Sequence, residues 1–340
     1  MKALVTGGSG YFGTALVKLL GTEGYQVRVF DLNPPEEQCE FEQGDIRDLE
    51  AVRRACRGVQ VVHHNVAQVP LARDRALFDS VNRVGTQNLL QASLAEGVSK
   101  VVYTSSSAVF GVPPVNPVVE DTPAVPQEAY GRAKLEGEKL CRDYAARGLD
   151  VTIIRPRTIL GHGRLGIFQI LFEWVRRGYN IPVLGSGDNL YQFVHSDDLA
   201  RACLLAGAHP GSDCFNIGAQ RFTSMRKTLE TLTQHAGTGS RVRSLPMALT
   251  VVGMKLAYWL GLSPLGPYHS LMYGRSLYFD CAHARRQLGW QAEYSNAEMI
   301  CQSYDWYLEN RERVLAAQPG RSLHQSSVRQ GVLALVGKFL

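Results

Sequence analysis

The chain has 340 residues, with an apolar fraction of 45% and a charged fraction of 20%. These values are ordinary for a soluble globular protein, and the length favours a main domain plus a smaller one. The net charge of +5, spread along the chain, is too small to indicate nucleic-acid binding. Seven scattered cysteines without a CxxC pair predict reduced thiols in a cytoplasmic protein and no metal site. The N-terminal sequence lacks the pattern of a signal peptide.

The first predicted strand, Ala3–Thr6, stops at glycine and is followed by a helix near Gly13–Leu20. Gly7, Gly10 and Gly13 are spaced three residues apart. One glycine can make the tight turn, one can let the backbone approach a pyrophosphate, and one can let the helix lie close to the strand. A phosphate would then sit on the free N–H groups of the helix N-terminus. Taken alone, the motif is equally consistent with a glycine-rich turn that binds no ligand.

The second predicted strand, Gln26–Asp31, ends in a carboxylate roughly twenty residues after the glycine turn. Asp31 can accept hydrogen bonds from both ribose hydroxyls and would repel a 2′-phosphate, which favours NAD over NADP. Asp45 and Ile46 follow the next unit in a loop, where they suit the two sides of an adenine. A solvated Asp45 in a simple turn is the alternative.

Strand-type and helix-type patterns alternate through the first half of the chain, which predicts a parallel sheet with helices on both faces. The predicted strands are Ala3–Thr6, Gln26–Asp31, Val59–His63, Lys100–Ser105 and Leu149–Arg155. The predicted helices lie near Gly13–Leu20, Asp48–Cys56, Leu77–Leu94 and Ala129–Ala146. Ligands of this architecture bind at the carboxyl ends of the strands.

The regular alternation ends after Arg155-Pro156. The next predicted elements are a helix at Arg164–Arg177 and strands at Asn189–Val194 and Phe215–Ile217. We expect an NAD-binding domain at residues 1–160, rejoined by segments near 190–218, then a mostly substrate-binding domain at 161–320 and a tail at 321–340.

Tyr130 and Lys134 are four residues apart in a predicted helix, so both side chains share one helix face. At a separation of about 4 Å and an effective dielectric constant near 20, a phenolate and an ammonium attract each other by roughly 4 kcal/mol. This attraction would lower the pKa of the phenol by at most about three units. The pair therefore suits a general acid or base near neutral pH, the alternative being a surface Tyr and Lys. The hydroxyls of Thr104 to Ser107 could hold a substrate oxygen beside it. Asn82 suits a buried structural or proton-relay role, or a surface position.

Two histidine clusters could suggest a metal, but neither has zinc or calcium spacing. His63 and His64 adjoin on a predicted strand and point to opposite faces, so one is expected near the cofactor and the other packed. His195 lies near Asp197 and Asp198, where the family resemblance given in the next paragraph implies a structural role. A serine hydrolase is disfavoured because the GxSxG turn is missing.

In the order of its motifs, the chain resembles the extended short-chain dehydrogenase/reductase superfamily, and within it the NAD-dependent epimerase/dehydratase group. The motifs are TGGSGYFG, Asp31, GDI, Asn82 in NRVGTQN, YTSSSAVFG, Tyr130-x-x-x-Lys134, Arg155-Pro156 and FVHSDDLA at Phe193–Ala200. The resemblance implies an α/β fold, a Rossmann-type doubly wound parallel sheet with a smaller α/β C-terminal substrate domain, and NAD as the cofactor.

The resemblance also implies roles for individual residues. Ser106, five residues before Gly111, would be the catalytic hydroxyl, with Ser105 and Ser107 as alternatives. Tyr130 would be the acid/base, and Lys134 would hold the nicotinamide ribose and lower the pKa of the tyrosine. The expected catalytic residues are Ser106, Tyr130, Lys134 and Asn82. The expected cofactor-binding residues are Gly7, Gly10, Tyr11, Phe12, Gly13, Asp31, Asp45, Ile46, Tyr130, Lys134 and Pro156.

The substrate is less defined by the sequence. Nucleotide-sugar enzymes of this group usually carry Arg at the position of Tyr191 and Asn at that of Thr158, so a standard UDP-sugar site is disfavoured. The C-terminal half is similar to 3β-hydroxysteroid and sterol 4α-carboxylate dehydrogenases. We therefore expect hydride transfer at a secondary alcohol or ketone of a bulky apolar, sterol-like small molecule. The alternative is a 4-epimerase or dehydratase acting on a nucleotide sugar or lipid-linked sugar.

Leu245–Leu262 is almost wholly apolar and too short for a confident membrane span. It predicts an apolar lid or an interfacial helix, with a buried core helix as the alternative. Peripheral membrane contact is expected through residues 245–262 or 328–340, the latter being alternatively a docked or frayed tail. The resemblance further implies a homodimer through the helices at Leu77–Leu94 and Ala129–Ala146.

Overall fold

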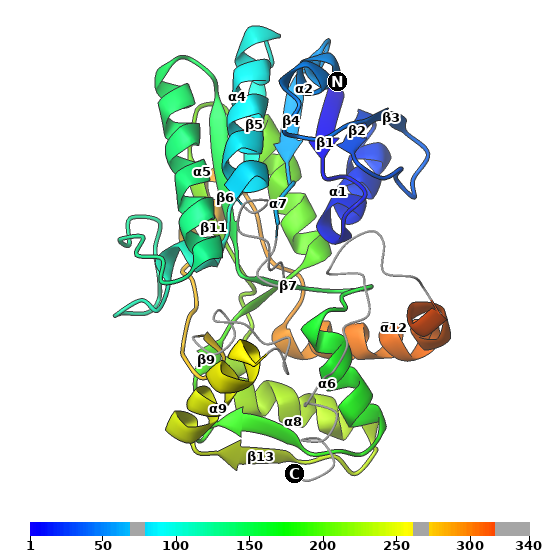
Figure 1. The fold of residues 1–340 in the computed structure, drawn as a ribbon, viewed down its shortest axis with the longest axis vertical. Coiled ribbons are helices and arrows are strands. Elements are labelled where there is room, and N and C mark those ends of the chain that lie inside the picture. Colours follow the sequence, from blue (N-terminus) through cyan, green and yellow to red (C-terminus); the bar gives the residue numbers. More distant parts are fainter. Residues whose placement is uncertain (69–78, 261–271, 317–340) are drawn as a thin grey trace.

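A computed structural model describes residues 1–68, 79–260 and 272–316 of the chain. At the centre of this part lies a parallel sheet of seven strands, in the upper half of Figure 1. The sheet confirms the α/β, Rossmann-type fold expected from the sequence. In spatial order its strands are β11 (Cys214–Ile217), β6 (Val151–Pro156), β5 (Lys100–Thr104), β4 (Val61–His64), β1 (Lys2–Thr6), β2 (Gln26–Asp31) and β3 (Glu40–Gln43).

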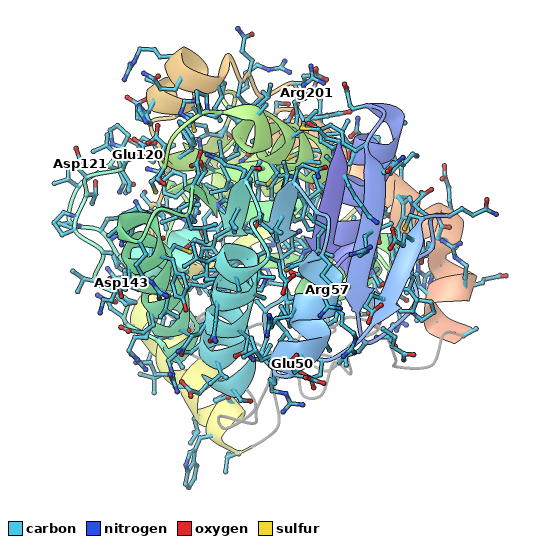
Figure 2. All side chains as sticks on the ribbon, turned by 90° about the horizontal axis from the view of Figure 1, so that it is seen from above. Glu50, Arg57, Glu120, Asp121, Asp143 and Arg201 are labelled. Carbon is cyan, nitrogen blue, oxygen red and sulfur yellow. The ribbon has the colours of Figure 1, made fainter. Side chains whose placement is uncertain are left out.

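Helices cover both faces of this sheet. On one face lie α1 (Tyr11–Thr22) and α7 (Ser196–Ala208), and on the other lie α2 (Leu49–Cys56), α4 (Gly85–Ala95) and α5 (Ala129–Ala146). Side chains of β1 alternate between the layers, with Ala3 and Val5 in the core beside α1 and Leu4 in the core beside α2. Seen from above, the exposed Arg201 of α7 and Glu50 of α2 lie on opposite outer faces (Figure 2).

The predicted helix Leu77–Leu94 differs from the structure at its start. Leu77 lies outside the described residues, and the described part begins with a π-helical turn, η1 (Ser80–Val84), before α4. Asn82 lies in this wider turn and is buried, so the surface alternative for this residue is wrong. Its side-chain amide makes two hydrogen bonds to the backbone of Gln68. It accepts from the N–H at 2.7 Å and donates to the carbonyl at 3.2 Å. The extra residue in the turn directs this amide toward the loop after β4.

A second layer of elements lies below the sheet in Figure 1 and has its own hydrophobic core. Aromatic residues such as Phe172, Trp174 and Tyr307 fill this core. The elements around it are α6 (Ile167–Arg176), β8 (Ile181–Leu184), α8 (Met225–Ala236), β13 (Val242–Leu245), α9 (Met247–Trp259) and α12 (Asn296–Ala316). The remaining described helices are the short η2 (Ser107–Phe110) and α11 (Ala282–Leu288).

The single strand predicted at Asn189–Val194 is in fact two short strands with different partners. β9 (Leu190–Tyr191) pairs with β12 (Thr223–Ser224), and β10 (Phe193–His195) pairs with β7 (Thr158–Leu160). The break falls at Gln192, whose buried side chain donates to the Ala219 carbonyl and accepts from the Phe279 N–H. These bonds to other segments divide the strand.

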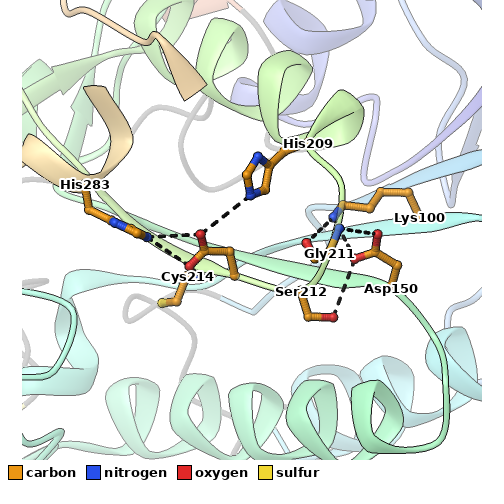
Figure 3. A network of polar contacts seen from close by, with 8 residues as sticks. Lys100, Asp150, His209, Gly211, Ser212, Cys214 and His283 are labelled. Carbon is orange, nitrogen blue, oxygen red and sulfur yellow. Dashed lines mark hydrogen bonds and ion pairs between the residues drawn. The ribbon is translucent and has the colours of Figure 1, made fainter. Parts of the chain in front are cut away.

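A polar network fixes the amino ends of three neighbouring strands, at the edge of the sheet opposite the glycine turn (Figure 3). Lys100 opens β5, and its ammonium donates to Asp150 at 2.7 Å and to the Gly211 carbonyl at 2.9 Å. Asp213, just before β11, contacts His283 of α11 at 3.0 Å. No group of three or more potential metal ligands occurs among the described residues. Through these contacts the network joins the starts of β5, β6 and β11 to one another and to α11.

One buried ion pair connects α5 to the sheet. Glu138 is fully buried in α5, and its carboxylate accepts two hydrogen bonds from Arg155 of β6, at 2.8 and 2.7 Å. The same carboxylate accepts from the Ser105 hydroxyl at 2.7 Å. Burial acts to raise the pKa of Glu138, but the hydrogen bonds from Arg155 and Ser105 and the charges of Arg155 and Arg142 together outweigh burial and lower the pKa. The carboxylate thus stays ionised and fixes α5 against the carboxyl ends of β5 and β6.

We predict that Glu138→Gln lowers the free energy of unfolding by about 3–5 kcal/mol, because the buried Arg155 loses its counter-charge. Urea denaturation at neutral pH measures this value. Glu136→Gln is the matched control in the same helix, since Glu136 pairs with Lys139 at the surface. We expect the control to lose less than about 1 kcal/mol, and equal losses in the two variants would contradict the assignment.

Candidate active site

A cavity of about 1060 Å³ opens at the carboxyl ends of the strands. It begins where the order of strands reverses, between β1 and β4, which is the place where such sheets bind ligands. Its size is at the upper end of the roughly 300–1,000 Å³ of small-molecule sites. Every residue expected to bind NAD, from Gly7 to Pro156, lines this cavity, and so does Ser106. Asn82, Arg155 and both histidines of β4 are not among its lining residues.

The glycine turn between β1 and α1 is built for close approach. Gly7 has a φ of +72°, and a Cβ on Gly13 would stand 2.0 Å from the Gly7 carbonyl oxygen. Gly8, which the sequence reasoning passed over, is equally constrained because its Cβ would stand 2.7 Å from Val29. Gly10 precedes α1 without a side-chain cap, so the first N–H groups of the helix face the cavity edge unshielded. This cradle fits a pyrophosphate.

The carboxylate of Asp31 lies at the end of β2 and lines the same cavity. It accepts hydrogen bonds from the N–H groups of Ser9 at 3.2 Å and Asn33 at 3.1 Å, which fix its direction. Burial raises the pKa of Asp31. Asp45, also at the cavity edge, is paired with Arg47, and this contact lowers the pKa of Asp45. The cradle and the Asp31 carboxylate fit the pyrophosphate and ribose of NAD.

The hydroxyl of Tyr130 is hydrogen-bonded to the side chain of Ser106. Ser106 caps the start of η2, where its side chain accepts from the Ala108 N–H at 3.2 Å. The neighbouring serines have other partners, since Ser105 donates to Glu138 and Ser107 accepts from the Arg157 guanidinium at 2.8 Å. Of the three serines considered from the sequence, Ser106 is the one that meets Tyr130.

Lys134 lies one turn after Tyr130 and is buried, with 3% of its surface exposed. Its ammonium donates to the Thr104 carbonyl at 2.7 Å and stands 5.0 Å from the centre of the Tyr103 ring. Burial lowers the pKa of Lys134 to about 8. The end of β5 therefore holds the amine at the cavity wall.

The expected lowering of the Tyr130 pKa is wrong for this arrangement. Burial raises the pKa of Tyr130 to about 12, and the hydrogen bond with Ser106 and the charge of Arg164 offset part of that rise. The Lys134 ammonium is directed to the Thr104 carbonyl, so it does not act as the main partner of the phenol. At neutral pH the phenol keeps its proton.

Neither histidine of β4 lines the cavity, although one of the two was expected near the cofactor, and both are packed in the interior. Burial lowers the pKa of His63 to about 4 and that of His64 to about 3, so both are neutral at pH 7. His64 bonds to the Thr6 hydroxyl at 2.7 Å and to the Thr86 hydroxyl at 3.1 Å. It ties β1 to α4 behind the cavity.

The cavity wall beyond Pro156 is predominantly apolar. Among the described lining residues after that position, the charged side chains are Arg157 and Arg164, both missed by the sequence reasoning. Arg157 is 1% exposed, and its guanidinium lies 4.9 Å from the centre of the Tyr191 ring. The apolar members are Ile159, Ile167, Phe168, Ile170, Leu171, Trp174, Ile181, Pro182, Leu184, Tyr191, Phe193, Met225, Leu229, Leu245, Met254, Ala257, Met272, Tyr273 and Ile300.

A family model described as "NAD dependent epimerase/dehydratase family" matches residues 3–218. An uncharacterized protein of Sinorhizobium fredii is 55% identical over 338 residues, covering 98% of this chain and 85% of that protein. A UDP-glucose 4-epimerase of Mycolicibacterium smegmatis is 30% identical over 331 residues, covering 90% of this chain and 98% of the relative. A 3β-hydroxysteroid dehydrogenase/Δ5→4-isomerase of Mycobacterium tuberculosis is 30% identical over 343 residues, covering 92% of each.

Among solved structures, a UDP-glucose 4-epimerase of Thermotoga maritima with UDP-glucose superposes with a TM-score of 0.77 at 25% identity. The match covers 92% of this chain and all of that chain. Similarity at this level reaches sugar-modifying and steroid-modifying relatives alike, so it leaves the substrate undetermined.

We predict that Gly13→Ala weakens NAD binding at least about tenfold, because the new Cβ displaces the Gly7 carbonyl. Isothermal titration calorimetry measures the affinity. Gly21→Ala is the matched control in the same helix, with no atom within 4 Å of the added Cβ. The control should bind NAD like the wild type and gain about 0.5–1 kcal/mol of stability. Unchanged affinity in Gly13→Ala would refute the cradle.

Proposed function

Because the chain belongs to the NAD-dependent epimerase/dehydratase family, we propose that it transfers hydride at a secondary alcohol or ketone of a bulky, sterol-like substrate. The protein is an enzyme of the extended short-chain dehydrogenase/reductase type, and its cofactor is NAD. The observation that carries the proposed substrate is the apolar cavity wall beside Ser106, Tyr130 and Lys134.

Bound NAD supplies the acceptor or donor of the hydride. We assign to the Ser106 hydroxyl the orientation of the substrate oxygen, and to the Tyr130 hydroxyl the proton that this oxygen gains or loses. Because the pKa of Tyr130 is raised to about 12, the phenol is protonated at neutral pH and ready to donate to a ketone. Alcohol oxidation, which needs the phenolate, should gain as the pH rises. Lys134 is assigned the ribose hydroxyls of the cofactor.

At one position, the wall that would contact the substrate lacks a cation for a diphosphate. Tyr191 stands where nucleotide-sugar enzymes usually carry Arg, and its hydroxyl lies 2.9 Å from the Thr158 hydroxyl. These two polar groups satisfy each other and offer no charge-assisted bond to phosphate. An apolar ring system would instead gain from contact with side chains such as Phe168 and Trp174.

A sugar 4-epimerase or dehydratase acting on a nucleotide sugar or lipid-linked sugar is the second candidate. It is favoured by the similarity to UDP-glucose 4-epimerases. The charged groups Arg157 and Arg164 in the cavity wall are the features that could meet an anionic sugar derivative.

We predict that the purified enzyme forms NADH when given NAD and a 3β-hydroxysteroid, because the apolar wall holds the ring system beside Tyr130. Absorbance of NADH measures this reaction. No net NADH should appear with UDP-glucose. No NADH with the steroid would contradict the sterol proposal, and a change of the sugar without net NADH would establish the epimerase alternative.

Tyr130→Phe is the control for the assigned chemistry. It removes the proton donor but keeps the ring, so turnover should fall by at least about a hundredfold while NAD affinity stays close to that of the wild type. Retained turnover in this variant would refute the acid/base assignment.

We also infer a cytoplasmic homodimer. The neighbouring helices α4 and α5 form a common outer layer, which is the dimer face expected from the resemblance. All seven cysteines are free thiols, which suits a reducing compartment. Light scattering on the purified protein measures the mass, and a monomer would contradict the proposed assembly.

A further inference from the structure

Helix α9 buries none of its residues, although it is one of the most apolar segments of the chain. It therefore cannot be the core helix considered from the sequence. One side of α9, formed by Thr250, Gly253, Met254 and Ala257, lines the cavity. α9 is thus a wall of the cavity that is also a surface of the molecule.

The outer side of α9 is a continuous apolar stripe. Leu249, Val252, Leu256 and Trp259 are 75%, 65%, 55% and 80% exposed, respectively. Their spacing of three, four and three residues places all four on one helix face. We call these four residues the outer stripe. Single exposed apolar residues are common, but a stripe of this kind marks a surface that contacts something other than water.

The chain segment that carries the outer stripe has charged residues of one sign only. Residues 231–279 contain no Asp or Glu, and their Lys and Arg residues are Arg241, Arg243, Lys255 and Arg275. All four are exposed, and Arg243 lies in β13, the strand that leads into α9. A helix rotates by about 100° per residue, and this rotation places Lys255 at the border of the outer stripe. An apolar helix face flanked by cations is typical of helices that lie in the surface of an anionic bilayer.

We propose that the outer stripe docks on an anionic lipid surface, with the flanking cations on the lipid phosphates. No described helix is long and apolar enough to cross a membrane, so the contact is peripheral. A second copy of the chain fits less well, because a symmetric contact through the stripe would bring like charges together. Trp259 at the end of the stripe suits the boundary between headgroups and acyl chains.

Docking in this orientation places the cavity wall against the bilayer. A sterol-like substrate could then leave the lipid and enter the cavity past the inner side of α9. This delivery step rests on the proposed function, whereas the docking itself rests on the stripe and its cations.

The test is co-sedimentation of the full chain with vesicles. Vesicles of phosphatidylcholine with phosphatidylglycerol should bind the protein at least about tenfold more tightly than vesicles of phosphatidylcholine, and high salt should release it. The double variant Leu249→Ser/Leu256→Ser should lose binding by about tenfold or more. Leu308→Ser in α12 replaces an exposed leucine outside the stripe, at 39% exposure, and should bind like the wild type.

Fluorescence gives a second readout that does not depend on the folding of a variant. Trp259 is 80% exposed, whereas Trp174 and Trp290 are 6% and 1% exposed and Trp306 is partly buried. Anionic vesicles should therefore shift the emission of the wild type to shorter wavelength, and Trp259→Phe should remove this shift while still sedimenting with vesicles.

Absence of binding, equal binding to both vesicle types, or full binding by the double variant would each overturn the docking proposal. A dimer that forms in the wild type and is abolished in the double variant would also overturn the docking proposal, because the stripe would then be a contact between copies. The double variant should keep the NAD affinity and turnover of the wild type, because neither leucine lines the cavity. Vesicle binding without steroid turnover would refute the proposed function and leave the docking intact.

Discussion

The active-site geometry depends on the ion pair between Glu138 and Arg155. Both groups are buried, so their desolvation cost largely cancels their attraction, and the pair contributes more to register than to net stability. Glu138 lies one helical turn after Lys134 and two after Tyr130. Anchoring that turn of α5 to β6 also anchors the phenol and the amine over the end of β5. The bond from Ser105 to the same carboxylate sets the path of the chain into Ser106.

Much of the fold was predictable because its signals are local. The glycine spacing predicted the turn between β1 and α1, and the carboxylate at the end of β2 followed at the expected distance. Tyr130 and Lys134 could be singled out because a spacing of four residues puts both on one face of any helix. These patterns need no knowledge of distant segments.

The remaining features depend on partners far along the chain. Three adjacent serines are equivalent in sequence. Ser106 is distinguished in the structure because Ser105 is hydrogen-bonded to Glu138 and Ser107 to Arg157. The pKa of Tyr130 could not be inferred from its distance to Lys134, because burial and the Thr104 carbonyl are contributed by other elements. Hydropathy alone could not distinguish an apolar core helix from an apolar surface helix. The sequence therefore did not decide whether α9 is buried or exposed.

The two halves of the cavity are formed by different parts of the fold. The half around the glycine turn belongs to the parallel sheet, whereas the apolar wall belongs to elements with their own hydrophobic core. Substitutions in α6, α8 or α9 can therefore reshape the apolar wall without disturbing the sheet and α5, which position the proposed catalytic groups. This separation is consistent with relatives of equal identity to this chain that are named for a sugar in one case and a steroid in another. Evolution of new specificity in such a chain can proceed by remodelling one wall.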